Sequence, residues 1–276
     1  MDNNYMNNVS SVEKVGKAIN DRIEYEKMLT EYVNQLRDRS NKDMIQKLGE
    51  RRAFKLEVLQ ECGIFYIGEM VEMLIPSYLN MVDEFGVISP TNRKPIFHNR
   101  FVIPIKNEVG MVQNLVGYSN EANERYIYGT ARYYRRRDTL WGLENLELAY
   151  DLGYAILTEG ITDAIRLRCM GYNNSFAMCG THKSEHNIKQ LNRCRHGVIK
   201  IPDRDDAGIR ASKHWNFNRS VTLHVNFKYK DIDEMCREQE NIEWFNSYME
   251  GCINWIKSGV NNNLGNIKIS ENVTIL

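Results

Sequence analysis

The chain reads YAILTEGITDAIRLRCMG from residue 154 to 171 and GVIKIPDRDDAG from 197 to 208. Each stretch begins with a short apolar run, passes through acidic residues and a glycine, and includes a helix-favouring pattern. Two further apolar runs complete the series, SFAMCGT (175–181) and VTLHVNF (221–227). Apolar strands that alternate with helical segments of about 10–15 residues are typical of a parallel sheet with right-handed crossovers. We therefore expect an α/β fold.

The residues before 150 predict a smaller lobe ahead of this sheet. Residues 1 to about 60 are polar and roughly keep a helical period, and a second helical pattern runs from Phe65 to Phe85. Between residues 101 and 128, short apolar runs around a turn predict β-strands. The expected parts are a helical N-terminal segment (1–50), a basic lobe (51–150), a parallel-sheet domain (151–245) and a tail (246–276) that ends in a short hairpin.

The overall composition excludes several classes of protein. With 276 residues and 42% hydrophobic content, the chain can bury a core, which excludes a disordered or fibrous protein. Lys and Arg together number 36, as do Asp and Glu, so nucleic-acid binding would require a local basic patch. No apolar run approaches the roughly 18 residues of a membrane helix. The six cysteines form no CxxC pair. We expect a cytoplasmic protein with reduced thiols and no membrane partner.

Acidic residues follow three of the predicted strands. Because ligands of open α/β sheets collect outside the carboxyl ends of the strands, we expect these acids to converge on one rim. Clustered carboxylates repel one another unless a divalent cation neutralises them, and hard ions such as Mg²⁺ or Mn²⁺ choose oxygen ligands. Taken singly, each acid is also explained as a helix cap or a solvated surface group. The acids are Glu159, Asp163, Asp203, Asp205, Asp231 and Asp233.

A local basic patch lies in the predicted β-rich lobe. Residues 91–142 contain nine Lys and Arg residues against four acids. RYYRRR at 132–137 mixes arginine with tyrosine, a composition suited to phosphate pairing and base stacking on a single strand. The alternative is a solvated charged turn with core tyrosines. We expect Arg135, Arg136 and Arg137 to bind nucleic acid and Lys230, beside the last acidic pair, to contact a phosphate.

Several motifs carry a resemblance to known families. Three of them resemble, in order and spacing, the Toprim signature of primases and topoisomerases: EGITDAI (159–165), CGT (179–181) and DRDDAG (203–208). Two upstream segments resemble DnaG-type primases and are not shared with topoisomerases: HNRFVIPIKNEVG (98–110) and TLWGL (139–143). The resemblance covers about residues 50–245. It implies a Toprim parallel-sheet domain preceded by a small β-rich and helical lobe, as in primase RNA polymerase cores.

The resemblance also implies roles for individual residues. Glu159, Asp203 and Asp205 correspond to catalytic, metal-binding acids, and Asp163, Asp231 and Asp233 to acids that assist with the metal. Arg100, Arg125 and Arg136 correspond to basic residues near the incoming nucleotide and template, although Lys is usual at the last two positions. The family's Gly-Gly-Arg after the β-turn is replaced by VGYS (116–119), which departs from the usual nucleotide contacts.

The expected function is synthesis of short RNA primers on single-stranded DNA from ribonucleoside triphosphates, by two-metal catalysis with Mg²⁺ or Mn²⁺, in phage replication. No cysteine precedes Cys62, so we expect the family's zinc ribbon on a separate zinc-binding protein, and a replicative helicase as a further partner. One alternative is a Toprim nuclease or topoisomerase fragment that uses the same acids to cut a phosphodiester. Another is a single-strand DNA-binding or interaction protein with a degraded site.

Overall fold

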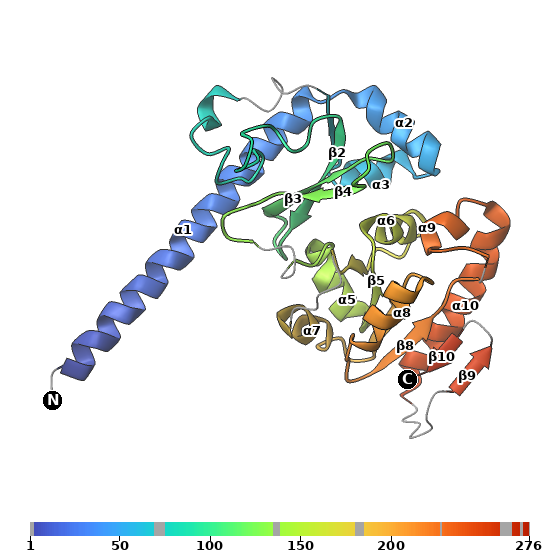
Figure 1. The fold of residues 1–276 in the computed structure, drawn as a ribbon. Helices are drawn as coiled ribbons and strands as arrows, with labels where there is room; N and C mark the ends of the chain where they lie inside the picture. The colour runs from blue at the N-terminus through green and yellow to red at the C-terminus, as the bar shows by residue number, and fades with distance from the viewer. Residues whose placement is uncertain are drawn as a thin grey trace.

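The computed structural model describes residues 3–68, 75–134, 139–179, 185–226, 228–259, 267–270 and 273–275, which form two lobes (Figure 1). The N-terminal lobe combines helices with a four-stranded antiparallel sheet in the order β1-β2-β3-β4. Its elements are α1 (Asn3–Arg39), α2 (Lys42–Arg52), α3 (Leu56–Glu61), β1 (Phe65–Ile67), a 3₁₀ turn (Pro76–Tyr78), β2 (Arg100–Lys106), β3 (Val112–Tyr118) and β4 (Tyr126–Tyr128).

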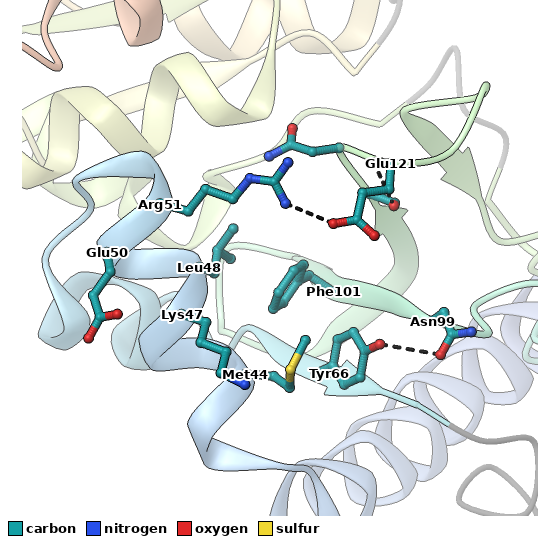
Figure 2. Close-up of a pocket in the computed structure, with 11 residues that line it drawn as sticks. Met44, Lys47, Leu48, Glu50, Arg51, Tyr66, Asn99, Phe101 and Glu121 are labelled. Carbon is teal, nitrogen blue, oxygen red and sulfur yellow. Dashed lines mark hydrogen bonds and ion pairs between the residues drawn. The ribbon is translucent and has the colours of Figure 1, made fainter.

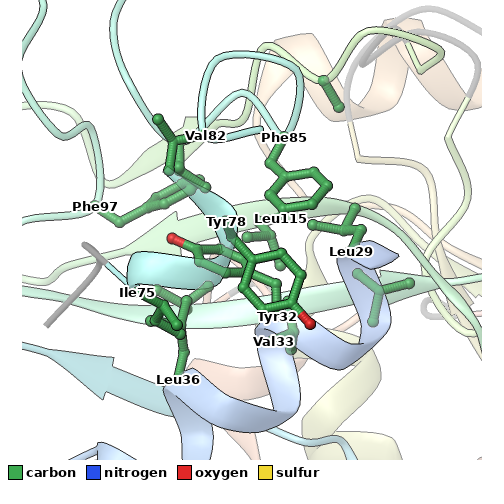
Figure 3. Close-up of a cluster of buried hydrophobic side chains, with 14 of the residues drawn as sticks. Leu29, Tyr32, Val33, Leu36, Ile75, Tyr78, Val82, Phe85, Phe97 and Leu115 are labelled. Carbon is green, nitrogen blue, oxygen red and sulfur yellow. The ribbon is translucent and has the colours of Figure 1, made fainter. Parts of the chain in front are cut away.

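Apolar side chains cover both faces of this sheet. On one face, the second half of α1 packs Leu29, Tyr32 and Leu36 against Leu115 of β3 and the segment around Phe85 (Figure 3). The other face packs against α2 and α3 and against α6 (Ile161–Cys169) of the second lobe. The two lobes therefore share one core, which fixes α2 relative to the parallel sheet.

The second lobe is a six-stranded sheet in the order β6-β5-β7-β8-β10-β9. The first four strands are parallel, and β10 runs antiparallel to both β8 and β9. Helices α6, α9 and α10 pack on one face, and α5 and α7 on the other. The elements are a 3₁₀ turn (Leu143–Asn145), α5 (Leu146–Leu152), β5 (Tyr154–Thr158), α6 (Ile161–Cys169), β6 (Ser175–Ala177), α7 (Glu185–Leu191), β7 (Gly197–Ile201), α8 (Asp206–Lys213), β8 (Ser220–Leu223), α9 (Ile232–Met235), α10 (Gln239–Lys257), β9 (Ile267–Ser270) and β10 (Val273–Ile275).

The expected fold class and the C-terminal hairpin are confirmed, but the helix predicted from Phe65 to Phe85 is wrong. Residues 65–67 form β1, in which Phe65 pairs with Val102 and Ile67 with Arg100. Pro76 then begins a single 3₁₀ turn, and residues 69–74 lie outside the described residues. A three-residue strand is too short to show an alternating pattern, so the longer helical pattern that follows it dominated the prediction.

Two predicted domain boundaries fall inside helices. The boundary after residue 50 lies within α2, and the boundary after residue 245 lies within α10. The division into four parts otherwise stays a prediction. Within the described part of the chain, no helix is both long and apolar enough to cross a membrane.

Candidate functional site

Two neighbouring parallel strands bring three acids to one edge of the sheet. Glu159 directly follows β5, and Asp203 and Asp205 follow β7, which pairs with β5 in parallel. Asp205 is the N-cap of α8, where its Oδ1 accepts a hydrogen bond from the Gly208 N–H at 2.8 Å. A Cβ added at Gly208 would lie 2.9 Å from Glu159 Oε2 and 2.7 Å from Asp203 Cβ. Glycine therefore lets α8 begin directly against both acids.

A lysine supplies positive charge at this rim. The Lys230 ammonium group lies 3.6 Å from Asp203 Oδ2 and 3.2 Å from Asp205 Oδ2. Its side chain is 52% exposed, so it reaches the acids from the solvent side. Lys230 precedes α9 and follows β8, as the sequence placed it. The lysine thus draws Asp203 and Asp205 together by charge.

Burial disfavours the charged forms of Glu159 and Asp203. Glu159 Oε2 is buried and accepts no hydrogen bond, and burial followed by repulsion from Asp205 raises the pKa of Glu159. Burial and then repulsion from Glu159 and Asp231 raise the pKa of Asp203 to about 7. Such shifts mark carboxylates whose negative charge is poorly solvated in the folded chain.

These shifts predict that the stability of the metal-free protein depends on pH. Because the folded pKa of Asp203 is about 7 against an ordinary 3.8, the folded chain holds a proton there that the unfolded chain has released. Stability should therefore fall as pH rises between about 4 and 7. We expect the Tm measured in EDTA to decrease across this window, and the decrease to be smaller in Asp203→Asn. An equal decrease in both proteins would contradict the assignment to Asp203.

The rim fits a divalent cation in the chemistry of its donors. Glu159, Asp203 and Asp205 offer hard carboxylate oxygens, and the buried Glu159 Oε2 has no hydrogen-bond donor of its own. In the arrangement seen here, two of these acids face the Lys230 ammonium group. No group of three or more His, Cys, Asp or Glu side chains among the described residues is already gathered for a metal ion.

Two further predicted acids lie behind and beside the rim. Asp163, on the first turn of α6, is 4% exposed, and its Oδ1 accepts a hydrogen bond from the Asp233 N–H at 3.0 Å. Burial and then repulsion from Asp231 and Asp203 raise the pKa of Asp163 well above its ordinary value. Asp231 is the N-cap of α9, where it accepts from the Glu234 N–H at 2.7 Å, and its pKa is also raised by burial. The structure therefore brings five predicted acids into one neighbourhood.

The sixth acid, Asp233, is bound by three arginines. It is fully buried, and its carboxylate pairs with Arg52 at the end of α2, with Arg166 of α6 at 3.1 Å and with Arg237 at 2.8 Å. Arg166 also donates to the carbonyl oxygens of Arg52 and Ala53. Asp233 thus joins the two lobes, and its role as a metal ligand stays a prediction that this pairing does not favour.

The predicted basic residues have different surroundings. Arg125 is exposed and lines an open groove of about 540 Å³ together with Lys230. Arg100 is buried, and it donates to the carbonyl oxygens of Glu124 at 2.9 Å and Arg125 at 3.4 Å. Arg100 therefore braces the turn before β4 and presents little surface to a nucleotide. Arg135, Arg136 and Arg137 lie outside the described residues.

Sequence reasoning missed three arginines of this neighbourhood. Arg51, Arg52 and Arg237 line the same groove as Arg125 and Lys230. Arg51 and Arg52 lie at the end of α2, within the stretch of residues 1 to about 60 for which the sequence predicted a helical period. The one available signal was the RR pair itself. It is a weak signal, because basic side chains are common at the C-terminal ends of helices for local electrostatic reasons.

Comparisons with known proteins find similarity to DNA primases. Residues 156–236 match a family model described as Toprim-like. A DNA primase of Thermotoga maritima is 25% identical over 232 residues, which cover 78% of this chain and 40% of the relative. A DNA primase of Aquifex aeolicus is 32% identical over 146 residues, which cover 51% of this chain and 29% of the relative.

Solved structures extend the match to the N-terminal lobe. A DnaG primase catalytic domain bound to ssDNA superposes with a TM-score of 0.71 and 18% identity, covering 87% of this chain and 84% of that chain. The chain has the fold of DnaG-type primase catalytic cores and is similar in sequence to DNA primases. The Aquifex aeolicus primase, with its zinc-binding and RNA polymerase domains, gives a TM-score of 0.70 at 22% identity and covers 84% of this chain and 61% of that one.

The superposition on the DnaG primase catalytic domain covers 87% of this chain and therefore includes both lobes, not the parallel sheet alone. All six predicted acids lie within the Toprim-like segment, whereas Arg52 and Arg125 lie in the lobe before it. The chain spans 40% or less of the length of the two DNA primases that it matches in sequence. The fold is therefore that of a DnaG-type primase core.

Proposed function

We propose that this chain catalyses the synthesis of short RNA primers on single-stranded DNA. The observation that carries the proposal is the position of Glu159, Asp203 and Asp205 on one rim, beside the groove lined by Arg125 and Lys230. Carboxylates next to an open basic groove suit an enzyme that joins nucleotides, because the substrates are polyanions and the acids hold divalent cations.

The acids would hold Mg²⁺ or Mn²⁺, with Glu159, Asp203 and Asp205 as the main ligands and Asp163 and Asp231 in support. When bound, two such ions stabilise the negative charge on the attacking and leaving oxygens of an in-line displacement. Residues of the chain do the remaining work. The Asp205 cap on α8 fixes the direction of its carboxylate, and Gly208 keeps the space beside Glu159 and Asp203 free of a side chain.

The groove would position the substrates. Arg125, Lys230 and Arg237 present three cations on one side of the acids, where a triphosphate or a template phosphate is attracted. Lys230 would move from Asp203 and Asp205 toward phosphate once the acids bind metal, because the metal ions would then neutralise the two carboxylates. Arg135, Arg136 and Arg137 are proposed to contact nucleic acid, on the strength of their sequence alone.

The proposed partners rest on these substrates and on the resemblance to DnaG-type primases. Single-stranded DNA is the proposed template, and ribonucleoside triphosphates are the proposed monomers. A separate zinc-binding protein and a replicative helicase are proposed to supply template selection and loading, and we place the protein in phage replication in the bacterial cytoplasm.

One incubation tests this function. The full chain is mixed with single-stranded DNA, labelled ribonucleotides and either Mg²⁺ or Mn²⁺, with EDTA and Glu159→Gln as controls, and the products are resolved by size. Short RNA oligomers that disappear in both controls are expected. Metal-dependent cleavage of the DNA would replace the proposal with a nuclease. DNA binding with no product in either metal would replace it with a binding protein that has a degraded site.

A further inference from the structure

A second cavity lies on the N-terminal lobe, between helix α2 and the four-stranded sheet (Figure 2). It measures about 520 Å³. Lys47 and Arg51 of α2 form one wall, and Tyr66 of β1 and Phe101 of β2 form the other. The proposed catalytic rim uses none of these four side chains, so the cavity needs an explanation of its own.

The sheet wall of the cavity presents two aromatic rings side by side. Tyr66 and Phe101 are direct partners across β1 and β2, with ring centroids 5.1 Å apart and an interplanar angle of 57°. Both are only half-buried, whereas Tyr118, the next aromatic in the same cross-strand row, is 1% exposed. Tyr66 and Phe101 therefore have exposed ring surface, on which another flat ring can stack.

The cavity also offers polar groups beside these rings. The Tyr66 hydroxyl donates to Asn99 Oδ1 at 3.3 Å, and Asn120 and Ser119 lie on the same lining. Amide and hydroxyl groups next to an aromatic surface can donate to and accept from the edge of a nucleobase.

The cavity and the basic groove of the catalytic site are continuous. Arg51 and Asn120 line both of them. The groove is lined by five basic and two acidic side chains, so it attracts a polyanion. These side chains are Arg51, Arg52, Arg125, Lys230, Arg237, Asp231 and Glu234. A nucleic-acid strand that follows the groove therefore reaches the Tyr66–Phe101 pair on passing Arg51.

A displaceable ion pair lies where the two spaces meet. Arg51 Nη1 is 3.0 Å from Glu121 Oε1, and the two side chains are 55% and 81% exposed. Exposed pairs of this kind are weak, so a phosphate can take the place of Glu121 at little cost. Arg51 is thus available to a strand that crosses from groove to cavity.

We propose that this cavity is a binding site for one base of single-stranded DNA, which stacks on Tyr66 and Phe101 while Arg51 contacts its phosphate. The proposal rests on the proposed function and extends it by placing the strand beyond the catalytic rim. Stacking on aromatic side chains tolerates any base, so the site would hold the strand without reading its sequence. A duplex would gain nothing here, because its bases are already stacked on one another.

Fluorescence anisotropy with a labelled oligothymidylate of about 16 nucleotides tests the site. Tyr66→Leu and Phe101→Leu are each expected to weaken binding about tenfold, because leucine keeps apolar bulk and removes the π face. Leu79→Ala, a change at a 49% exposed residue elsewhere on the lobe, should bind like the native chain. Glu121→Gln should tighten binding about twofold to threefold by freeing Arg51. Circular dichroism and Tm confirm that each variant is folded.

Photo-cross-linking gives a second, direct readout. The same oligonucleotide with a 5-iodouracil base should cross-link to Tyr66 or Phe101, as located by mass spectrometry. Cross-links elsewhere, or leucine variants that bind like the native chain, would overturn the base site while leaving primer synthesis intact. Loss of binding in the leucine variants of a chain that makes no primers would keep the base site and remove the primase proposal.

Discussion

Glu159→Gln is expected to lower nucleotide incorporation by about a thousandfold or more while leaving the fold intact. Glu159 and Asp203 both lie beside Gly208, and the buried Oε2 of Glu159 has no hydrogen-bond donor. An amide there binds a divalent cation poorly, and the loss of the charge stabilisation that metal ions provide is worth several kcal/mol, or about three powers of ten in rate. Single-turnover incorporation of a labelled ribonucleotide measures the effect.

The same variant should not lose stability, which separates a catalytic role from a structural one. The pKa of Glu159 is raised by burial and by repulsion from Asp205, so its charge opposes folding of the metal-free chain near neutral pH. Removing that charge should leave the Tm in EDTA unchanged or higher. Asp206→Asn is the matched control, since Asp206 is exposed on the first turn of α8 beside Asp205. Equal activity in both variants would remove Glu159 from the proposed site.

The position of the acidic rim could be predicted from the sequence because its geometry follows from one rule. Residues that follow neighbouring parallel strands meet at the same edge of the sheet, so Glu159, Asp203 and Asp205 could be placed together without knowledge of the rest of the chain. Asp231 is placed in the same way, after β8. Local patterns were sufficient for these residues because each acid is positioned by its own strand.

The contacts between the lobes could not be predicted in this way. Arg52 contacts Asp233 only because α2 packs against the parallel-sheet domain. No periodic pattern in the sequence predicts that packing. The Tyr66–Phe101 pair was missed for a related reason, since residues 65–67 were predicted as helix and the partner strand is distant in sequence. The family resemblance placed Arg100 near the incoming nucleotide, whereas its burial and its hydrogen bond to the Glu124 carbonyl show that it braces a turn.

Asp233→Asn is expected to destabilise the protein by about 3–5 kcal/mol, the largest loss of stability that we expect from a single charge removed from this chain. The substitution leaves Arg52 and Arg166, whose side chains are 7% and 3% exposed, buried without a carboxylate. Removing one partner of a buried ion pair costs far more than the pair contributes, because the remaining charge stays out of water. Urea denaturation of both proteins measures the difference.

The matched control for this prediction is Asp231→Asn, two residues earlier. Asparagine is as good an N-cap as aspartate, and the pKa of Asp231 is raised by burial, so this change should cost little stability. If Asp233 served mainly as a metal ligand, the two variants would show similar stability in EDTA and similar losses of metal-dependent activity. If Asp233 joins the lobes, its variant alone loses stability without metal, because three arginines and the end of α2 depend on one carboxylate.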